Sequence, residues 1–563
     1  MFDAIVIGSG MSGGIAAKEL CERGLKVLVL ERGNEVRHRQ DYQDMVMPWD
    51  MPNAMMVNEE ELARDYGVQR ECYAVNSLTK QFFVKDSEHP YTTPEDKPFA
   101  WIRGYHTGGR SLMWGRQSYR LSAMDFEANA RDGHGSDWPI RYEDLAPWYS
   151  HVESFIGVSG SAEGLDQLPD GDFLPPFEFN DGEAMFAAAV AAHFDGRKVI
   201  PARVANLREA RDHHRAMGRT QCQVRSICER GCSFGAYHSS LSTSLPAAFA
   251  TGNLTLVHDA IVDSIEHDPA TNRVTGVKVI DRVTKARTTY QANIIFSCAS
   301  TIGTAAILLN SRSEAFPRGL ANSSDQVGRN LMDHLYQLLT VGIYPNGPDS
   351  YYFGRKPGSM YIPRYRNLPG QEREAFLRGF GFQGGFFRTG GASTAIGQLG
   401  IGEGLKAGPR QLGPWLSYLG GFGEVLPNPD NRVTLSTTET DQWGIPIPHI
   451  AAEFGPNEFA MIDRIMEDGR AMVEAAGGTV LFQKSDPGKF GLGIHEMGTA
   501  RMGVDPANSV LGQWNQAHDV PNLFITDGAA MASSGCQNPS LTYMALSARA
   551  ADAAVSMMAE GVL

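Results

Sequence analysis

The stretch FDAIVIGSGMSGGIAAKELCERG, residues 2–24, decides the fold. It opens with FDAIVI, a short apolar and β-branched run that suits a buried parallel strand. A glycine-rich loop follows at once, and IAAKELCERG then predicts a helix that Gly24 ends. The next apolar run, LKVLVLERG, predicts a second strand. Strand, glycine loop, helix and strand together indicate a βαβ dinucleotide-binding unit.

The glycines of this loop each have a physical role in such a unit. Gly8 permits the tight turn, Gly10 lets the backbone approach a pyrophosphate, and Gly13 lets the helix pack on the strand. An acid at the end of the second strand would bind the ribose hydroxyls. A turn that binds nothing is the alternative, which the complete unit disfavours. The predicted cofactor-binding residues are Gly8, Gly10, Gly13, Gly14, Glu31 and Arg32, and this motif alone does not separate FAD from NAD.

Composition excludes several classes of protein. The chain has 563 residues and 61.4 kDa, with 42% hydrophobic residues, so it is globular and large enough for two domains or one domain with a large insert. Its net charge of -14 argues against nucleic acid or an anionic membrane as the main partner. No apolar run is long enough to span a membrane. Seven cysteines in so long a chain do not indicate a disulfide framework, so reduced or metal-bound thiols are expected.

Further glycine-rich and polar motifs follow the βαβ unit and are spread along most of the chain. They are RGYHTGGRSLMWGRQSYR (103–120), CASTIGTAAILLNS (298–311) followed by VGRNLMDH (327–334), HEMGTARMG (495–503) and TDGAAMASSGCQNPSLTYMAL (526–546). In this order they resemble the glucose-methanol-choline (GMC) family of FAD oxidoreductases. Each motif alone could be a glycine-rich turn, but turns would not explain the order. The resemblance implies FAD as the cofactor.

The resemblance also implies an α/β fold in which a Rossmann-like FAD-binding domain is interleaved with a substrate-binding domain built on an antiparallel sheet. The predicted FAD-binding domain comprises 1–45, 96–335 and 491–563, with an iron-sulfur segment at 220–235; 46–95 is a lid or partner segment, and 336–490 is the substrate-binding domain. Within the last range, YYFGRKPGSMYIPRYR and GFGFQGGFFRTG indicate strands and loops.

Several FAD contacts follow from the resemblance alone. They are predicted at Gly108, Gly109, Ser111, Trp114, Gly115, Val262, Asp527, Gly528 and Asn538. Some relatives carry a histidine that bonds covalently to the flavin within a GGxSxHW pattern, whereas this chain has GGRSLMW with Met113 at that place. Methionine does not form that bond, so we predict FAD that dissociates on unfolding.

Alcohol oxidation needs a base for the hydroxyl proton and a donor that steadies the developing alkoxide. His495 suits the first role, because a neutral imidazole accepts a proton near neutral pH, and the amide of Asn538 suits the second. The pair matches the His/Asn variant of the family. The alternative is that His495 caps a turn and Asn538 orders a loop, which the motifs around them disfavour. Gln383 is predicted as a partner for a substrate hydroxyl, and Phe380 and Phe382 are expected in the core.

Three cysteines, Cys222, Cys228 and Cys232, stand in the polar stretch CQVRSICERGC. Free thiols, a zinc site with His238 as the fourth ligand, and an iron-sulfur cluster all remain open on spacing alone. The segment resembles that of the FAD subunits of bacterial three-subunit sugar dehydrogenases, which implies a 3Fe-4S cluster on these three thiols. Such a cluster would pass the two electrons of a flavin singly to a cytochrome c-type acceptor.

The whole chain, including DWPIRYEDLAPWY at 137–149, most resembles bacterial FAD-dependent glucoside 3-dehydrogenases. This implies oxidation of the C3 hydroxyl of glucose, disaccharides or glucosides to a keto sugar, by proton abstraction and hydride transfer to flavin N5. Gluconate, sorbitol or glucose C1 dehydrogenases are the neighbouring alternatives. A pyranose-type oxidase that uses oxygen is another, and a non-catalytic flavoprotein or lyase is a third, against which His495 and Asn538 argue.

Expected partners are a small signal-bearing subunit and the cytochrome c-type acceptor. The N-terminus runs straight into FDAIVIGSG without the charged region and cleavage site of an export signal. By resemblance to the multi-subunit relatives, we expect periplasmic localisation by carriage with the small subunit through twin-arginine export. The cytoplasm is the alternative.

Overall fold

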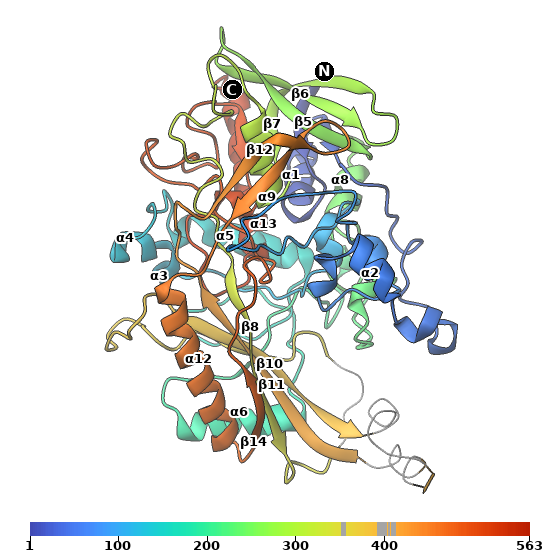
Figure 1. Cartoon of the computed structure of the whole chain (residues 1–563), viewed down its shortest axis with the longest axis vertical. Coiled ribbons are helices and arrows are strands. Elements are labelled where there is room, and N and C mark those ends of the chain that lie inside the picture. Colours follow the sequence, from blue (N-terminus) through green and yellow to red (C-terminus); the bar gives the residue numbers. More distant parts are fainter. Residues whose placement is uncertain (351–355, 391–401, 404–405, 407–411) are drawn as a thin grey trace.

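The computed structural model describes residues 1–350, 356–390, 402–403, 406 and 412–563. The first five residues of the YYFGRK run, 351–355, lie outside these ranges. Figure 1 shows an elongated molecule with one sheet near both chain termini and a second sheet at the opposite end. The fold is the mixed α/β arrangement that the sequence predicts.

The helices vary from single turns to long rods. Their bounds are α1 Met11–Glu22, α2 Glu59–Asp65, α3 Ala123–Phe126, α4 Ala128–Asp132, α5 Tyr142–Ile156, α6 Asp181–His193, α7 Asp212–Ala216, α8 Ser244–Ala250, α9 Thr301–Asn310, α12 Pro456–Ala475 and α13 Ser540–Ala559. None of the described helices is long and apolar enough to cross a membrane.

The strands fall into two large sheets and one hairpin. Their bounds are β1 Phe2–Ile7, β2 Val27–Leu30, β3 Ile200–Pro201, β4 Leu254–Val257, β5 Ala260–Asp268, β6 Arg273–Asp281, β7 Arg287–Ser297, β8 His334–Tyr344, β9 Met360–Ile362, β10 Phe380–Gly390, β11 Leu412–Glu424, β12 Arg432–Thr440, β13 Pro446–Ala451, β14 Thr479–Lys484 and β15 Leu523–Ile525.

The first sheet has the order β4-β2-β1-β7-β6-β5, with β15 also paired to β7. The pairs β1–β2, β1–β7, β2–β4 and β7–β15 are parallel, and β5, β6 and β7 are antiparallel neighbours. The apolar run of β1 is buried from Ala4 to Ile7 because it lies between two parallel strands. The predicted strand, loop, helix and strand are therefore confirmed.

Helix α1 starts earlier than the sequence predicts, at Met11 and not at Ile15. The reason is Gly13, which lies inside the first turn. A Cβ at Gly13 would stand 2.0 Å from the Gly8 carbonyl oxygen, so only glycine lets the helix begin this close to β1. Helix α1 also packs on α13, the C-terminal helix, and Figure 1 shows both near the chain termini.

The second sheet has the order β14-β8-β11-β10-β9-β3. Neighbouring strands in the described part of this sheet run antiparallel to one another. In Figure 1, α12 and α6 lie beside it, and their apolar residues join those of the sheet in one core cluster. Phe380 and Phe382 are buried in that cluster, which confirms them as core residues. The antiparallel sheet is the one expected for 336–490, although β3 joins it from residues 200–201. The predicted domain boundaries stay predictions.

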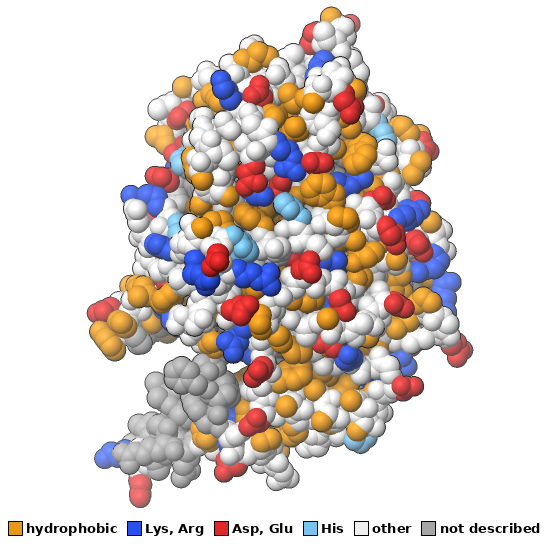
Figure 2. All heavy atoms as spheres, turned by 180° about the vertical axis from the view of Figure 1, so that it is seen from behind, with side chains coloured by type: hydrophobic (Ala, Val, Ile, Leu, Met, Phe, Trp, Pro, Cys, Tyr) orange, Lys and Arg blue, Asp and Glu red, His pale blue; other side chains and the backbone are white. Residues whose placement is uncertain are grey.

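The β12–β13 hairpin belongs to neither large sheet. It lies against α9 and shares a buried cluster with it, in which Val433 and Ile450 meet Ile302. Residues 46–95 contain α2 and several short 3-10 turns, in keeping with the weak periodicity of that stretch. Figure 2 shows acidic and basic side chains interspersed over the face seen from behind.

Candidate active site

One continuous cavity of about 1110 Å³ brings together motifs that are far apart in the sequence. It is large enough for a dinucleotide and a substrate, since pockets for drug-sized ligands span roughly 300–1,000 Å³. The predicted residues in its wall are Gly8, Gly10, Glu31, Arg32, Gly109, Ser111, Trp114, Gly115, Cys222, Cys228, Val262, Gln383, His495, Asp527, Gly528 and Asn538. Gly13, Gly14, Gly108 and Cys232 are not among its lining residues.

Gly13, Gly14 and Gly108 pack against other protein atoms next to the cavity wall. Gly13 and Gly14 face protein atoms, and a Cβ at Gly14 would stand 2.4 Å from the Ser244 hydroxyl. Gly108 has a φ of 81°, and its N–H donates to Ser9 Oγ at 2.9 Å, which joins the second motif to the first. Their close packing explains why these positions are glycine, and their assignment as cofactor-binding residues stays a prediction.

The N-terminus of α1 opens into the cavity beside Gly10. No side chain caps this end, and the first turn holds no acid, so its backbone N–H groups are available. A Cβ at Gly10 would have as its nearest neighbour the Gly108 carbonyl oxygen at 3.9 Å, so the loop surface is open. Free N–H groups and the helix dipole together suit a pyrophosphate.

Two carboxylates lie where a dinucleotide would need them. Glu31 follows β2 and is 6% exposed; its Oε2 accepts from Ser9 Oγ at 2.6 Å, and burial raises its pKa. Asp527 follows β15; its Oδ1 accepts from the Ala529 N–H at 2.9 Å, and burial raises its pKa to about 6. Together with the open loop, these acids at parallel strand ends fit FAD.

His495 is held by a second imidazole that the sequence did not single out. The Nε2 of His334 lies 2.9 Å from the Gly535 carbonyl oxygen, and its Nδ1 lies 3.0 Å from Nδ1 of His495. A carbonyl only accepts, so Nε2 of His334 carries the proton. Burial lowers the pKa of His334 to about 4, so its ring is neutral and its Nδ1 is a bare acceptor.

The proton between the two rings therefore belongs to Nδ1 of His495, and its Nε2 is unprotonated and keeps its lone pair. Burial lowers the pKa of His495 well below its ordinary value, with further contributions from His334 and Arg110. Its backbone N–H donates to Asp333 Oδ1 at 3.0 Å, which fixes the residue from the other side. His495 is thus a neutral base in a defined tautomer.

Asn538 completes the pair. Its Nδ2 lies 3.3 Å from Nε2 of His495, and its Oδ1 accepts from Nε2 of Gln383 at 2.5 Å. Because Gln383 occupies the amide oxygen, the amide nitrogen is turned toward the histidine. A hydroxyl placed beside both groups, on the cavity side, would donate to Nε2 and accept from Nδ2. The structure brings these three residues together, while substrate contact by Gln383 stays a prediction.

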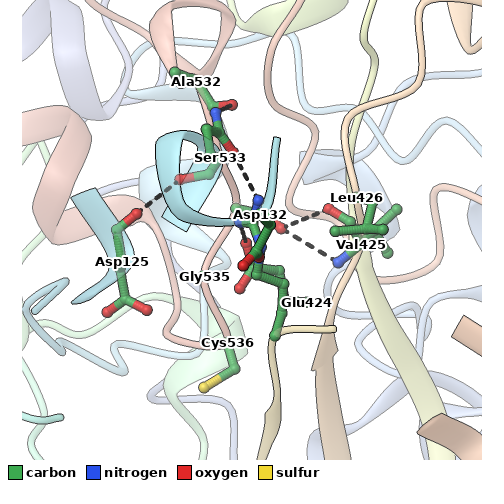
Figure 3. A network of polar contacts seen from close by, with 12 residues as sticks. Asp125, Asp132, Glu424, Val425, Leu426, Ala532, Ser533, Gly535 and Cys536 are labelled. Carbon is green, nitrogen blue, oxygen red and sulfur yellow. Dashed lines mark hydrogen bonds and ion pairs between the residues drawn. The ribbon is translucent and has the colours of Figure 1, made fainter. Parts of the chain in front are cut away.

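A polar network surrounds residues 532–536, the segment that carries the Gly535 carbonyl (Figure 3). In the view, Ser533 points toward Asp125, and its Oγ donates to the Asp125 carbonyl oxygen at 3.3 Å. The carboxylate of Glu424, at the end of β11, accepts the backbone N–H of Gly535. Since Gly535 is tied to the sheet in this way, its carbonyl presents a fixed acceptor to His334.

Replacing His334 with leucine is expected to lower the rate of flavin reduction by about tenfold, because one hydrogen bond worth roughly 1.4 kcal/mol is lost. His334→Gln should recover much of the rate, since an amide oxygen accepts from Nδ1 of His495 while the amide nitrogen donates to Gly535. Stopped-flow reduction across pH measures both variants. Equal rates for the two variants would contradict a role in setting the tautomer.

Two of the three clustered cysteines, Cys222 and Cys228, line the same cavity, and Cys232 packs against a buried cluster behind it. All seven cysteines of the chain are free thiols. Between the first two, Val224 adopts a φ of 55°, a strained conformation for a β-branched residue, and its N–H donates to the Cys222 sulfur at 3.4 Å. Strain and an N–H aimed at sulfur are features of ligand-holding loops.

A single metal ion would need its ligand atoms close together. Among the described residues, the set that meets this condition is Asp333, His334 and His495, and the hydrogen bonds given above account for it. His238 does not join the cysteines in such a set; its Nδ1 is bonded to Thr243 Oγ1 at 2.6 Å. The zinc alternative with His238 as the fourth ligand is therefore not supported.

Comparison with known proteins gives matches along the whole chain. Two family profiles, both described as GMC oxidoreductase, match residues 2–336 and 427–547. A fructose dehydrogenase large subunit from Gluconobacter japonicus is 28% identical over 99% of this chain and 98% of its own. A 2-methyl-1,2-propanediol dehydrogenase from Mycolicibacterium austroafricanum is 30% identical over 98% of this chain and 94% of its own. A solved pyridoxine 4-oxidase from Mesorbium loti shares the fold, with a TM-score of 0.60 and 18% identity over 98% of both chains.

Proposed function

The chain belongs to the GMC oxidoreductase family, and from this premise we propose that it is an FAD-dependent dehydrogenase that oxidises the C3 hydroxyl of glucose, disaccharides or glucosides. The observation that carries the proposal is the pairing of His495 Nε2 with Asn538 Nδ2 at 3.3 Å in the wall of the cavity. A base with a free lone pair and an amide donor aimed at the same point are what alcohol oxidation needs.

The residues of the chain act in a defined order. The substrate hydroxyl contacts both His495 and Asn538 from the cavity side, and Nε2 of His495 takes its proton while Nδ2 of Asn538 donates to the developing alkoxide. FAD, when bound, supplies the two-electron acceptor that takes the carbinol hydrogen as a hydride. Charge on the protonated imidazole is then stabilised through the Nδ1 contact with His334.

The proposed FAD is not covalently attached. Met113 lines the cavity at the position where some relatives place the bonding histidine, and its thioether has no proton to exchange for a flavin bond. Precipitating the purified protein with acid is therefore expected to release all of the yellow colour into the supernatant, which absorbance at the flavin maximum measures. Colour that stays in the washed pellet would contradict this prediction.

A sugar substrate is supported by the fructose dehydrogenase large subunit among the relatives. The position C3 rests on the resemblance of the whole sequence to glucoside 3-dehydrogenases. Incubation with glucose, disaccharides and glucosides, followed by NMR of the products, tests both. We expect 3-keto sugars; gluconate, sorbitol or glucose C1 oxidation would replace this assignment, and failure of every sugar to bleach the flavin would overturn the proposal.

The proposal includes a 3Fe-4S cluster on Cys222, Cys228 and Cys232, which would pass single electrons to a cytochrome c-type acceptor. Each thiolate of a cluster binds a different iron, so its sulfurs stand farther apart than those around a single ion. Two of the thiols lie in the wall of the same cavity that is proposed to hold the flavin. Iron and acid-labile sulfide analysis with EPR, on protein purified without oxygen, tests it; absence of iron together with peroxide release would favour the oxidase.

A relative that is one subunit of a larger enzyme supports partner subunits for this chain. We include a small signal-bearing subunit and the cytochrome in the proposal, with periplasmic localisation by carriage. Cell fractionation with the small subunit co-expressed tests the location. Activity confined to the cytosol under these conditions would favour the alternative.

A further inference from the structure

Among the residues that the structure describes, three arginine side chains are completely buried, and they differ in one respect. Arg203 pairs with Asp170 at 2.6 Å, and Arg378 pairs with Glu424 at 2.7 Å. Arg219 is also 0% exposed, yet it forms no ion pair within the part of the chain that the structure describes. A buried cation without a counter-charge is costly, so an uncompensated one marks a place where an anion belongs.

The groups around Arg219 show which of them could supply a negative charge to its guanidinium. Its Nε donates to the Gly235 carbonyl oxygen at 2.8 Å, while Nη1 and Nη2 have no partner among the described atoms. The titratable groups that face it are the imidazoles of His38, His214 and His238 and the thiol of Cys232. Burial lowers the pKa of each of these histidines, so none supplies a charge of either sign.

Cys232 is therefore the group near Arg219 that could bind an anionic cofactor. Arg219 and Cys232 lie on neighbouring segments of the chain. The Thr220 N–H donates to the Phe234 carbonyl oxygen at 2.9 Å, and the Gly235 N–H donates to the Cys232 carbonyl oxygen at 2.9 Å. The side chain of Arg219 crosses over Gly235, where a Cβ would stand 3.2 Å from its Cγ. The guanidinium is thus fixed at the turn that begins with the cysteine.

A second cation approaches the thiols from the cavity side. Arg116 is 8% exposed, lines the cavity next to Cys228, and interacts electrostatically with that thiol. Its carboxylate partner, Glu229, is 4.0 Å away, a loose contact. Three neutral thiols carry no charge for the two arginines to balance. Three thiolates that hold an iron-sulfur core would carry a net negative charge, which both arginines would balance.

We propose that Arg219 is the buried counter-charge of an anionic iron-sulfur cluster held by Cys222, Cys228 and Cys232, and that it favours the reduced state of that cluster. The inference rests on the cluster of the proposed function. Reduction adds one electron, derived from the oxidised alcohol through the flavin, and no bond to a protein ligand breaks. The cluster becomes more negative by one charge, so a nearby fixed cation stabilises the reduced state more than the oxidised state.

The test compares Arg219→Gln, Arg219→Lys and the wild type as purified, FAD-loaded protein. EPR-monitored redox titration under argon gives the midpoint potential, and iron and FAD contents are measured on the same samples. We expect Arg219→Gln to disfavour reduction at least tenfold, about 59 mV more negative for one electron, and Arg219→Lys to stay near the wild type. Arg203→Gln is the matched control, because it also removes a buried arginine but leaves the thiols alone.

Each outcome decides the inference. A negative shift in Arg219→Gln alone supports it, as does loss of iron in Arg219→Gln with FAD and iron retained in Arg219→Lys. Full iron with an unchanged potential in Arg219→Gln overturns the inference and leaves the cluster intact. Equal loss of iron in both Arg219 variants also overturns it, because shape and not charge would then matter. Wild-type protein without iron removes the cluster itself, and the inference with it.

Discussion

Replacing His495 with alanine is expected to slow flavin reduction by about 10²- to 10⁴-fold, the usual contribution of a general base. The imidazole is the group with a free lone pair beside the amide of Asn538, so its removal leaves the substrate proton without an acceptor. FAD should stay bound, because the open end of α1 and the carboxylates of Glu31 and Asp527 do not depend on this ring. Single-turnover stopped-flow reduction with excess sugar measures the effect.

The pH dependence gives the same prediction a second readout. Burial and the neighbouring His334 and Arg110 lower the pKa of His495, so its neutral, active form persists below pH 6.5, the ordinary value for imidazole. The wild-type rate should fall on the acid side only below that value, as the ring gains a proton. His495→Ala should lose this acid limb. His193→Ala, at the exposed end of α6, is the control and should match the wild type.

A variant that reduces its flavin at close to the wild-type rate would rule out His495 as the base. If Asn538→Ala alone abolished turnover, the amide and not the imidazole would carry the chemistry. A slow His495→Ala variant that has also lost FAD would point to binding, so FAD content per protein is measured beside the rate.

The cofactor half of the site could be predicted from sequence because its residue types follow from local geometry. The glycine loop after an apolar strand and the acid at Glu31 lie within one βαβ unit, where spacing along the chain sets position in space. The start of α1 was wrong by a few residues, because the packing of Gly13 on Gly8 depends on contact between two elements. A glycine inside a predicted helix usually argues against it.

The contact between His334 and His495 could not be predicted from the residues alone. His334 stands in the VGRNLMDH motif, but nothing local shows that its ring meets His495, which lies far along the chain. That contact depends on β8 bringing its first residue against His495 and on the carbonyl of Gly535 fixing the proton. Arg219 was missed for the same reason, since an unpaired buried arginine appears only when all its neighbours are known.

Replacing Cys228 with alanine is expected to separate the two halves of the proposed reaction. The cluster should be lost, and electron transfer from reduced flavin to cytochrome c should fall by more than about 10- to 100-fold, since loss of a ligand exceeds the usual cost of losing a supporting contact. Reduction of the flavin by sugar should stay at the wild-type rate, because His495 and Asn538 do not contact this thiol. The two rates are measured separately, by stopped flow and by cytochrome reduction at steady state.

The matched control is Cys21→Ala, which removes a buried thiol from the C-terminal end of α1, away from the cavity wall. It should keep iron, FAD and both rates. If Cys228→Ala reduced cytochrome c as fast as the wild type, electrons would leave the flavin without passing through the three thiols. If its flavin were instead reoxidised by oxygen with release of peroxide at the wild-type rate of turnover, the loop of Cys222 to Cys232 would serve only to hold the fold, and the enzyme would be an oxidase.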